Sequence, residues 1–264
     1  MLYIILPAFN EVQALPHIFR DIQEQCAALA YRIVVVNDGS TDGTGPLLRR
    51  CQRRIPDLKV IEHSDNRGLG QALLSGFYYA VQAATAAGND LNQGEEAPPD
   101  VIITLDADNT HPADRIPLLY EAIQNGADLA IASRFTRSSR QFGLSAERKL
   151  LSWGAGTVLR LFFPVKGLRD YSCGFRAYRL PLMRRALQTY HENLIECRSF
   201  AAMVEVLLKI LPLCKNIREV PLELHYERKQ SLSKLRAGAT IREYLLIIYR
   251  LKRAMRSSLE WAGQ

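Results

Sequence analysis

Short apolar runs recur along the first half of the chain and alternate with longer segments of helical periodicity. They predict strands at 3–6, 33–36, 58–61, 101–105 and 129–132. Alternation of this kind is typical of right-handed βαβ units, which build a mainly parallel sheet with helices on both faces. The predicted fold class is therefore α/β, an open sheet in one large domain.

The connections are less regular. A helical segment, 69–87, follows the third strand, and the polar, acidic stretch 88–100 carries Pro98 and Pro99. We interpret that stretch as a surface insertion. Further along, the pattern predicts an exposed loop at 136–145, a helix at 147–163 and a final strand at 217–226.

The last part of the chain, 227–264, predicts a basic flexible loop and then an amphipathic helix from about 237 to 258. The apolar stripe of this helix comprises Ile241, Leu245, Ile248, Met255 and Leu259. Between Arg228 and Arg256 there are nine basic residues and one acidic residue, whereas the whole chain carries a net charge of +7. The stripe either packs on the protein's own sheet or lies at an anionic membrane surface.

The composition indicates where the protein is located and which partners it has. Five cysteines are scattered without metal-binding spacing, which is typical of reduced thiols in a cytoplasmic protein. The apolar run 2–6 stops at Pro7 without a basic region before it, and no window has the length of a spanning helix. We therefore expect no signal peptide, no transmembrane helix and at most a peripheral contact at the cytoplasmic face of a membrane. A nucleic-acid partner is not expected, because no aromatic platform accompanies the basic residues.

Two carboxylates, Asp106 and Asp108, directly follow the apolar run 101–105. The ends of parallel strands at one edge of an open sheet form its ligand crevice. Hard cations such as Mg²⁺ are usually held by one or two carboxylates plus substrate phosphates. The pattern predicts a Mg²⁺ or Mn²⁺ site for a nucleotide-bearing substrate, and the simpler alternative is an Asp-rich turn.

Polar motifs follow the other strands as well. They are P-A-F-N-E at 7–11, V-N-D-G-S-T-D-G-T at 36–44, N-R-G-L-G at 66–70, D-A-D-N-T-H-P at 106–112, A-S-R-F at 132–135, D-Y-S-C-G-F-R at 170–176 and S-L-S-K-L at 231–235. In this order they resemble family 2 glycosyltransferases of GT-A fold, within them the dolichol-phosphate mannose synthases and related polyprenyl-phosphate sugar transferases. The resemblance implies a GT-A (Rossmann-like) domain over 1–226. It also implies inverting transfer of a hexose, mannose or glucose, from a GDP- or UDP-sugar to a polyprenyl phosphate.

The resemblance also implies the site residues. Substrate contacts are expected from Pro7, Phe9, Glu11, Val36, Asp38, Ala107 and Arg176. Metal ligands are expected to be Asp106, Asp108 and Thr110, which stands where related transferases carry Gln, so that water or His111 completes the coordination. Phosphate groups are expected to meet Arg134, Arg148, Arg228 and Lys234. Gly68 and Gly70 open a helix, where they serve either close packing or a phosphate contact.

The acceptor is the main open question. A lipid phosphate is already largely ionised near pH 7 and needs no general base. A sugar or small-molecule hydroxyl, the alternative acceptor for a soluble family 2 enzyme, needs a base such as Glu205 or Asp170. A sugar-phosphate nucleotidyltransferase is disfavoured because 7–11 is not a Gly-rich basic loop. Whether a separate membrane subunit anchors the protein stays open.

Overall fold

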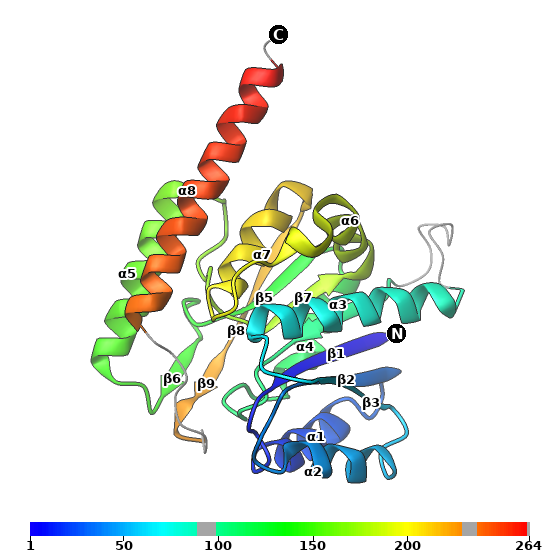
Figure 1. Ribbon diagram of the computed structural model, residues 1–264. Helices are drawn as coiled ribbons and strands as arrows, with labels where there is room; N and C mark the ends of the chain where they lie inside the picture. The colour runs from blue at the N-terminus through cyan, green and yellow to red at the C-terminus, as the bar shows by residue number, and fades with distance from the viewer. Residues whose placement is uncertain (89–98, 229–236, 263–264) are drawn as a thin grey trace.

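The computed structural model describes residues 1–88, 99–228 and 237–262 and centres on a seven-stranded sheet (Figure 1). Its strands are β1 (Leu2–Ala8), β2 (Tyr31–Asp38), β3 (Leu58–His63), β4 (Val101–Thr104), β5 (Leu129–Ser133), β7 (Arg176–Arg179) and β8 (Ile217–Pro221), in the order β3-β2-β1-β4-β7-β5-β8. Strand β7 is antiparallel to both of its neighbours, and the other pairs are parallel. The predicted mainly parallel α/β sheet is confirmed.

Helices cover both faces of this sheet. They are α1 (Leu15–Gln25), α2 (Thr44–Gln52), α3 (Leu69–Ala86), α4 (Arg115–Gln124), α6 (Leu180–Tyr190) and α7 (Ala202–Ile210). Figure 1 shows α1 and α2 on one side of β1 to β3 and α3 on the other. The central strands are therefore buried on both faces, which is why β1 and β4 are apolar almost throughout.

Two expectations about connections were wrong. The expected loop 136–145 contains a short strand, β6 (Arg140–Phe142), and the expected strand 217–226 is divided into β8 and β9 (Glu223–His225). Strands β6 and β9 pair in a separate two-stranded sheet. Leu222 joins the two sheets, because its N–H donates to Ser133 O while its carbonyl accepts from Arg140 N.

Two further helices, α5 (Ala146–Phe162) and α8 (Ala237–Ala262), contact each other beside the main sheet, and α8 extends well beyond it (Figure 1). The side chains of Ile247 and Ile248 on α8 are buried, whereas Ile241 and Leu245 are exposed. The expected apolar stripe is thus only partly the packing face; the side chains of its last two members, Met255 and Leu259, lie outside the described residues. Over the described ranges, no helix has both the length and the apolar character needed to cross a bilayer.

The proposed domain boundaries stay predictions. The insertion 88–100 falls mainly on residues 89–98, and the basic loop after 226 falls mainly on 229–236, both outside the described residues. Where the chain is described again, Asp100 accepts a hydrogen bond from the N-terminal ammonium group of Met1 at 2.7 Å. The second end of the insertion, at Asp100, is therefore close to β1, beside which β4 begins.

The start of α3 lies unusually close to another backbone segment. Gly68 has a φ of +93°, and a Cβ there would come within 2.4 Å of Arg198 O. A Cβ on Gly70 would come within 1.9 Å of Cys197 O. These two glycines therefore serve close packing, the first of the two roles considered from the sequence.

We predict that Gly70→Ala lowers the free energy of unfolding by about 1–3 kcal/mol, because the added methyl group collides with a backbone oxygen rather than with a movable side chain. Gly154→Ala is the matched control, since that helical glycine in α5 has nothing within 4 Å of its added Cβ. The control should gain up to about 1 kcal/mol from helix propensity. Urea denaturation of both variants measures the difference, and a neutral Gly70→Ala would contradict the packing role.

Candidate active site

A pocket opens at the carboxyl ends of β1, β2 and β4. It lies at the point between β1 and β4 where the order of the strands in the sheet reverses direction. It is lined by Pro7, Ala8, Phe9, Glu11, Asp38, Asn66, Gly68, Leu69, Ala72, Asp106, Ala107, Asp108, Arg198, Ser199 and Phe200. Seven of the residues expected from the sequence are brought together here. Val36 is the exception in the nucleoside group, because its side chain is fully buried within β2 and does not line the pocket.

The turn after β1 is locked to the turn after β2. Asn10 adopts a φ of +55°, its backbone N–H donates to Ser40 Oγ, and its side-chain oxygen accepts from Thr41 N at 2.8 Å. The N–H of Glu11 donates to Thr44 Oγ1 at 3.0 Å. The polar residues of the second motif therefore fix the shape of the first, which is how Pro7 to Glu11 become a rigid pocket wall.

Asp38 faces the pocket but is already held by protein groups. Its Oδ1 lies 2.7 Å from His63 Nδ1 and accepts from the N–H of Arg67, and its Oδ2 accepts from the N–H of Gly68 at 2.8 Å. His63 Nε2 in turn lies 3.0 Å from Ser75 Oγ. The carboxylate thus ties the end of β2 to the start of α3 and has one fixed orientation toward a ligand.

Asp106 and Asp108 both line the pocket at the end of β4. Asp108 Oδ1 accepts from Thr110 Oγ1 at 2.7 Å and from Thr110 N at 3.2 Å. The N–H of Asp106 donates to His111 Nδ1 at 3.3 Å. Thr110 and His111 are buried and do not line the pocket; Thr110 orients the Asp108 carboxylate, and His111 holds the backbone of Asp106.

This carboxylate pair suits a divalent cation shared with a ligand. Among the described residues there is no group of three or more His, Cys, Asp or Glu side chains arranged to hold a metal. Two carboxylates beside an open pocket instead match the pattern in which substrate phosphates supply the remaining ligands. The side chains present therefore fit a Mg²⁺ or Mn²⁺ ion that binds together with a diphosphate.

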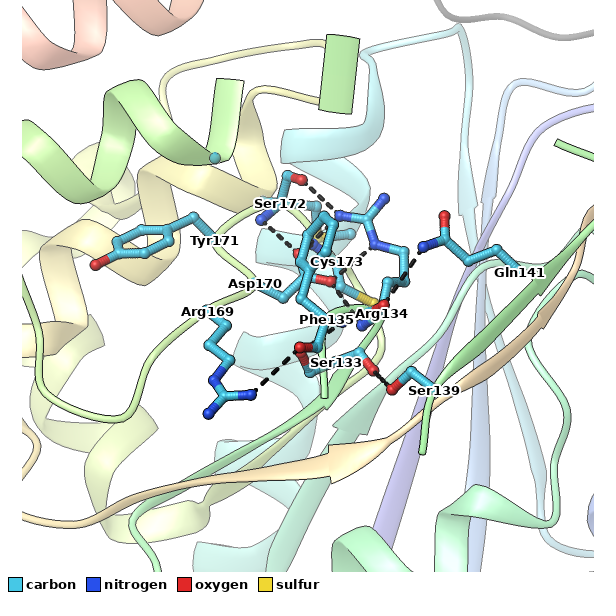
Figure 2. Close-up of polar contacts among 12 residues, drawn as sticks. Ser133, Arg134, Phe135, Ser139, Gln141, Arg169, Asp170, Tyr171, Ser172 and Cys173 are labelled. Carbon is cyan, nitrogen blue, oxygen red and sulfur yellow. Dashed lines mark hydrogen bonds and ion pairs between the residues drawn. The ribbon is translucent and has the colours of Figure 1, made fainter. Parts of the chain in front are cut away.

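Arg134 forms a bidentate ion pair with Asp170, which Figure 2 shows at the end of β5. Its Nε and one terminal nitrogen donate to the carboxylate at 2.8 and 2.7 Å, and that terminal nitrogen also donates to Ser172 Oγ at 2.7 Å. The carboxylate also accepts from the N–H groups of Arg134, Ser172 and Cys173. These contacts hold the positively charged guanidinium group of Arg134 in one position.

The surroundings of Asp170 decide its protonation. Burial by itself raises the pKa of this carboxyl group, but the Arg134 guanidinium and the backbone N–H donors outweigh it and hold the pKa below its ordinary value. Burial also raises the pKa of the neighbouring Cys173 thiol to about 12. Asp170 is consequently ionised at neutral pH, and Cys173 is an uncharged, buried packing residue.

Glu205, the other carboxylate considered as a base, is similarly occupied. It is buried in α7 and accepts from the N–H groups of Glu196 and Cys197 at 2.9 and 2.8 Å. Lys209 Nζ lies 2.7 Å from its other oxygen and 3.1 Å from the Glu196 carboxylate. Glu205 therefore holds a loop in place.

The remaining expected cations have different surroundings. Arg176 is fully buried and donates to the carbonyls of Met203 and Tyr171 at 2.6 and 2.8 Å, so the expected substrate contact is replaced by a structural role. Arg228 is exposed in the 3₁₀ segment Tyr226–Arg228, just beyond β9. The backbone of Arg148 lies in α5, but its side chain and all of Lys234 lie outside the described residues.

One pocket wall was missed from the sequence, the consecutive residues Arg198, Ser199 and Phe200. They lie between the 3₁₀ segment η1 (His191–Leu194) and α7, far along the chain from the motifs. The sequence shows only an ordinary polar segment before an apolar helix at this position. The only sequence feature connected with this loop is the pair Gly68 and Gly70, against which it packs.

Comparison with known proteins gives consistent matches. A model of glycosyl transferase family 2 matches residues 3–187. A dolichol-phosphate mannosyltransferase of Pyrococcus furiosus is 33% identical over 262 residues, which cover 99% of this chain but only 64% of the relative. A polyprenol monophosphomannose synthase of Mycolicibacterium smegmatis is 30% identical, with 91% of this chain and 82% of the relative covered.

The fold also has close counterparts among solved structures. One is a glucosyl-3-phosphoglycerate synthase from Mycobacterium tuberculosis in complex with Mn²⁺, uridine diphosphate and phosphoglyceric acid. The TM-score is 0.64 at 18% identity, and the match covers 94% of this chain and 77% of the other. This likeness supports the GT-A architecture.

We predict that Asp170→Asn lowers the free energy of unfolding by about 3 kcal/mol or more at pH 7, because it leaves the Arg134 charge without its buried partner. A carboxyl group whose pKa is lowered on folding stabilises the fold above its unfolded pKa of about 3.9, and this contribution is lost as pH falls through the folded value. The gap between wild type and variant, measured by urea denaturation, should therefore close below about pH 4.

The control for this prediction is Asp21→Asn, which breaks the exposed pair with Arg20. That change should cost less than about 1 kcal/mol. Equal losses in the two variants, or a gap that does not change with pH, would show that the Asp170 carboxylate is not the stabilising group.

Proposed function

The chain belongs to glycosyl transferase family 2, and on that basis we propose that it transfers a hexose, mannose or glucose, from a nucleoside-diphosphate sugar to the phosphate of a polyprenyl lipid, with inversion. The relatives named for transfer to dolichol-phosphate and for polyprenol monophosphomannose synthesis support this acceptor. The proposal depends mainly on one observation, namely that the carboxylates of Asp170 and Glu205 are both engaged in ion pairs and hydrogen bonds within the protein.

A hydroxyl acceptor has to lose a proton to a general base during transfer, whereas an ionised lipid phosphate does not. Asp170 is held by Arg134 with a lowered pKa, and Glu205 is held by Lys209 and two backbone N–H groups. Both carboxylates considered for this role are therefore already occupied by protein donors. This supports a phosphate acceptor over the hydroxyl alternative.

On the donor side, Asp106 and Asp108 would hold the divalent cation, and Thr110 keeps Asp108 oriented. When bound, Mg²⁺ or Mn²⁺ neutralises charge on the diphosphate as it leaves. The mycobacterial structure in complex with both Mn²⁺ and uridine diphosphate supports this assignment. Pro7, Phe9, Glu11 and Asp38 form the wall against which the nucleoside is positioned.

Further cations complete the proposed clamp on the phosphates. Arg134 supplies a fixed guanidinium, and Arg148, Arg228 and Lys234 supply additional positive charge, as the family resemblance implies. Arg228 is well placed for this role, because His225, three residues earlier, donates its N–H to the carbonyl of Thr110. The segment after β9 thus begins beside the carboxylate turn.

The lipid acceptor requires a membrane surface, and we propose that α5 and α8 contact its cytoplasmic face. Among the side chains that the structure describes, the large apolar ones exposed here are Trp153, Val158, Leu161 and Phe162 on α5 and Ile241, Leu245, Leu246 and Tyr249 on α8. Basic side chains of α8 accompany them, namely Arg242, Arg250, Lys252 and Arg253. Apolar residues beside cations are the pattern of a helix at a lipid interface. Anchoring by a separate membrane subunit is the alternative.

Transfer itself gives the direct test. With radiolabelled GDP-mannose or UDP-glucose, Mn²⁺ and a polyprenyl phosphate, we predict label in a butanol-extractable lipid, and none when the acceptor is the corresponding polyprenol. Asp108→Ala should lower this transfer at least about 100-fold, because it removes charge stabilisation at the leaving diphosphate. Asp114→Ala, at an exposed aspartate near the same turn, should be fully active.

Two results would contradict this proposal. Full transfer by a folded Asp108→Ala protein would reject the metal assignment. Labelling of phosphoglyceric acid or another small hydroxyl compound, with none of the lipid, would instead favour the hydroxyl acceptor.

Co-flotation with vesicles tests the membrane contact. We predict that the protein floats with phosphatidylserine-containing vesicles at low salt and less at high salt, because the headgroup attraction is screened. Leu161→Glu on α5, where the leucine is 77% exposed, should weaken binding at least about tenfold. Leu118→Glu on α4, at an exposed leucine outside the two helices, is the control and should bind normally. Absence of the wild type from vesicles at low salt would contradict membrane contact through α5 and α8.

A further inference from the structure

The loop between η1 and α7, residues 195–201, forms one wall of the pocket through Arg198, Ser199 and Phe200. Three separate parts of the fold hold this loop. Because a wall made of loop residues keeps its shape only through such contacts, the groups that hold it also determine the shape of the pocket.

The first contact is with the buried helix α7. Glu205 accepts the N–H groups of Glu196 and Cys197, and Lys209 neutralises both Glu205 and Glu196. A buried carboxylate with a charged partner and two backbone donors is a strong restraint. The first half of the loop is therefore fixed to α7.

The second contact is with the donor side of the pocket. Arg198 donates from Nε to Arg67 O at 2.9 Å and from a terminal nitrogen to Asn66 O at 3.0 Å. The N–H groups of Arg67 and Gly68 point the other way and donate to Asp38. One peptide segment thus connects the loop to the carboxylate that faces the nucleoside.

The third contact comes from α8. Ser199 Oγ donates to the carboxylate of Glu243, while it also accepts from the N–H of Ala201 at 3.1 Å. A second pair, Arg250 with Glu196, is 3.9 Å apart between largely exposed side chains and adds little. Glu243 is therefore a direct polar link from α8 to the pocket wall.

We propose that Glu243 is a positioning residue for the nucleotide-sugar donor, which it acts on through Ser199. The helix that carries the exposed apolar face then also sets the position of a pocket residue. This inference rests on the proposed use of the pocket by a nucleoside diphosphate. It predicts that breaking the contact weakens donor binding while the groups that carry out the transfer stay in place.

The test is calorimetric titration of GDP and UDP with Mn²⁺, with no lipid present. Glu243→Ala and Ser199→Ala should each raise the Kd of the nucleotide that wild type binds by about fivefold, the lower end of typical coupling between two sites. The double variant should bind no more weakly than Ser199→Ala, because both changes remove the same contact. Glu243→Gln keeps an acceptor oxygen and should stay within about twofold of wild type.

Kinetics separate positioning from general damage. In transfer assays, Glu243→Ala should raise the donor KM by the same factor as the Kd and leave kcat unchanged. Glu192→Ala, at an exposed glutamate in η1 close to the loop, is the matched control and should leave Kd, KM and kcat as in wild type. Thermal unfolding checks that each variant is folded, and Ser199→Ala tests the same contact if Glu243→Ala does not fold.

The outcomes are distinct. Unchanged nucleotide affinity in folded Glu243→Ala, or effects of the two single variants that simply add, would overturn the role of Glu243 and leave the proposed function standing. A fall in kcat with unchanged KM would overturn it as well. A wild-type protein that binds neither nucleotide would overturn the proposed function and this inference together.

Discussion

The Asp170 carboxylate is the contact on which much of the fold depends. It is fully buried, and it accepts from the Arg134 side chain and from the N–H groups of Arg134, Ser172 and Cys173 (Figure 2). A charge that has left water is tolerated only when it is paired and hydrogen-bonded. All of these donors must therefore be in place together, and in place they join the end of β5 to the segment that leads into β7.

Strand β7 marks the limit of what the apolar pattern could predict about the fold. Parallel strands such as β4 are buried on both faces and are recognisable as apolar runs. β7 has the sequence R-A-Y-R yet lies in the middle of the sheet, where the two terminal nitrogens of Arg176 donate to the carbonyls of Met203 and Tyr171. Those partners exist only after folding, so the local sequence does not reveal the strand. β6 and β9, three residues each, are too short for any periodicity.

The candidate site was predictable for a geometric reason, and only in part. Parallel strand ends meet at one edge, so the polar motifs after β1, β2 and β4 had to come together. Arg198 lines the same pocket, but its loop lies about 130 residues further along the chain than Arg67, whose carbonyl it contacts. This loop does not follow a strand of the sheet, so the pattern of strand ends could not predict it. Gly68 and Gly70 are explained by this loop, because only residues without a Cβ allow its backbone to pass.

The environment of Tyr244 restricts how α8 can serve both lipid and pocket. Burial raises the pKa of this phenol to about 12, and the Arg134 and Asp170 charges also act on it, so the uncharged Tyr244 side chain lies near that ion pair. Lifting the whole helix into a bilayer would separate Tyr244 from the ion pair and withdraw Glu243 from Ser199. The face with Ile247 and Ile248 must therefore stay on the protein, and only the opposite face is left for lipid. Membrane contact and an ordered pocket wall are then compatible, because they use different sides of one helix.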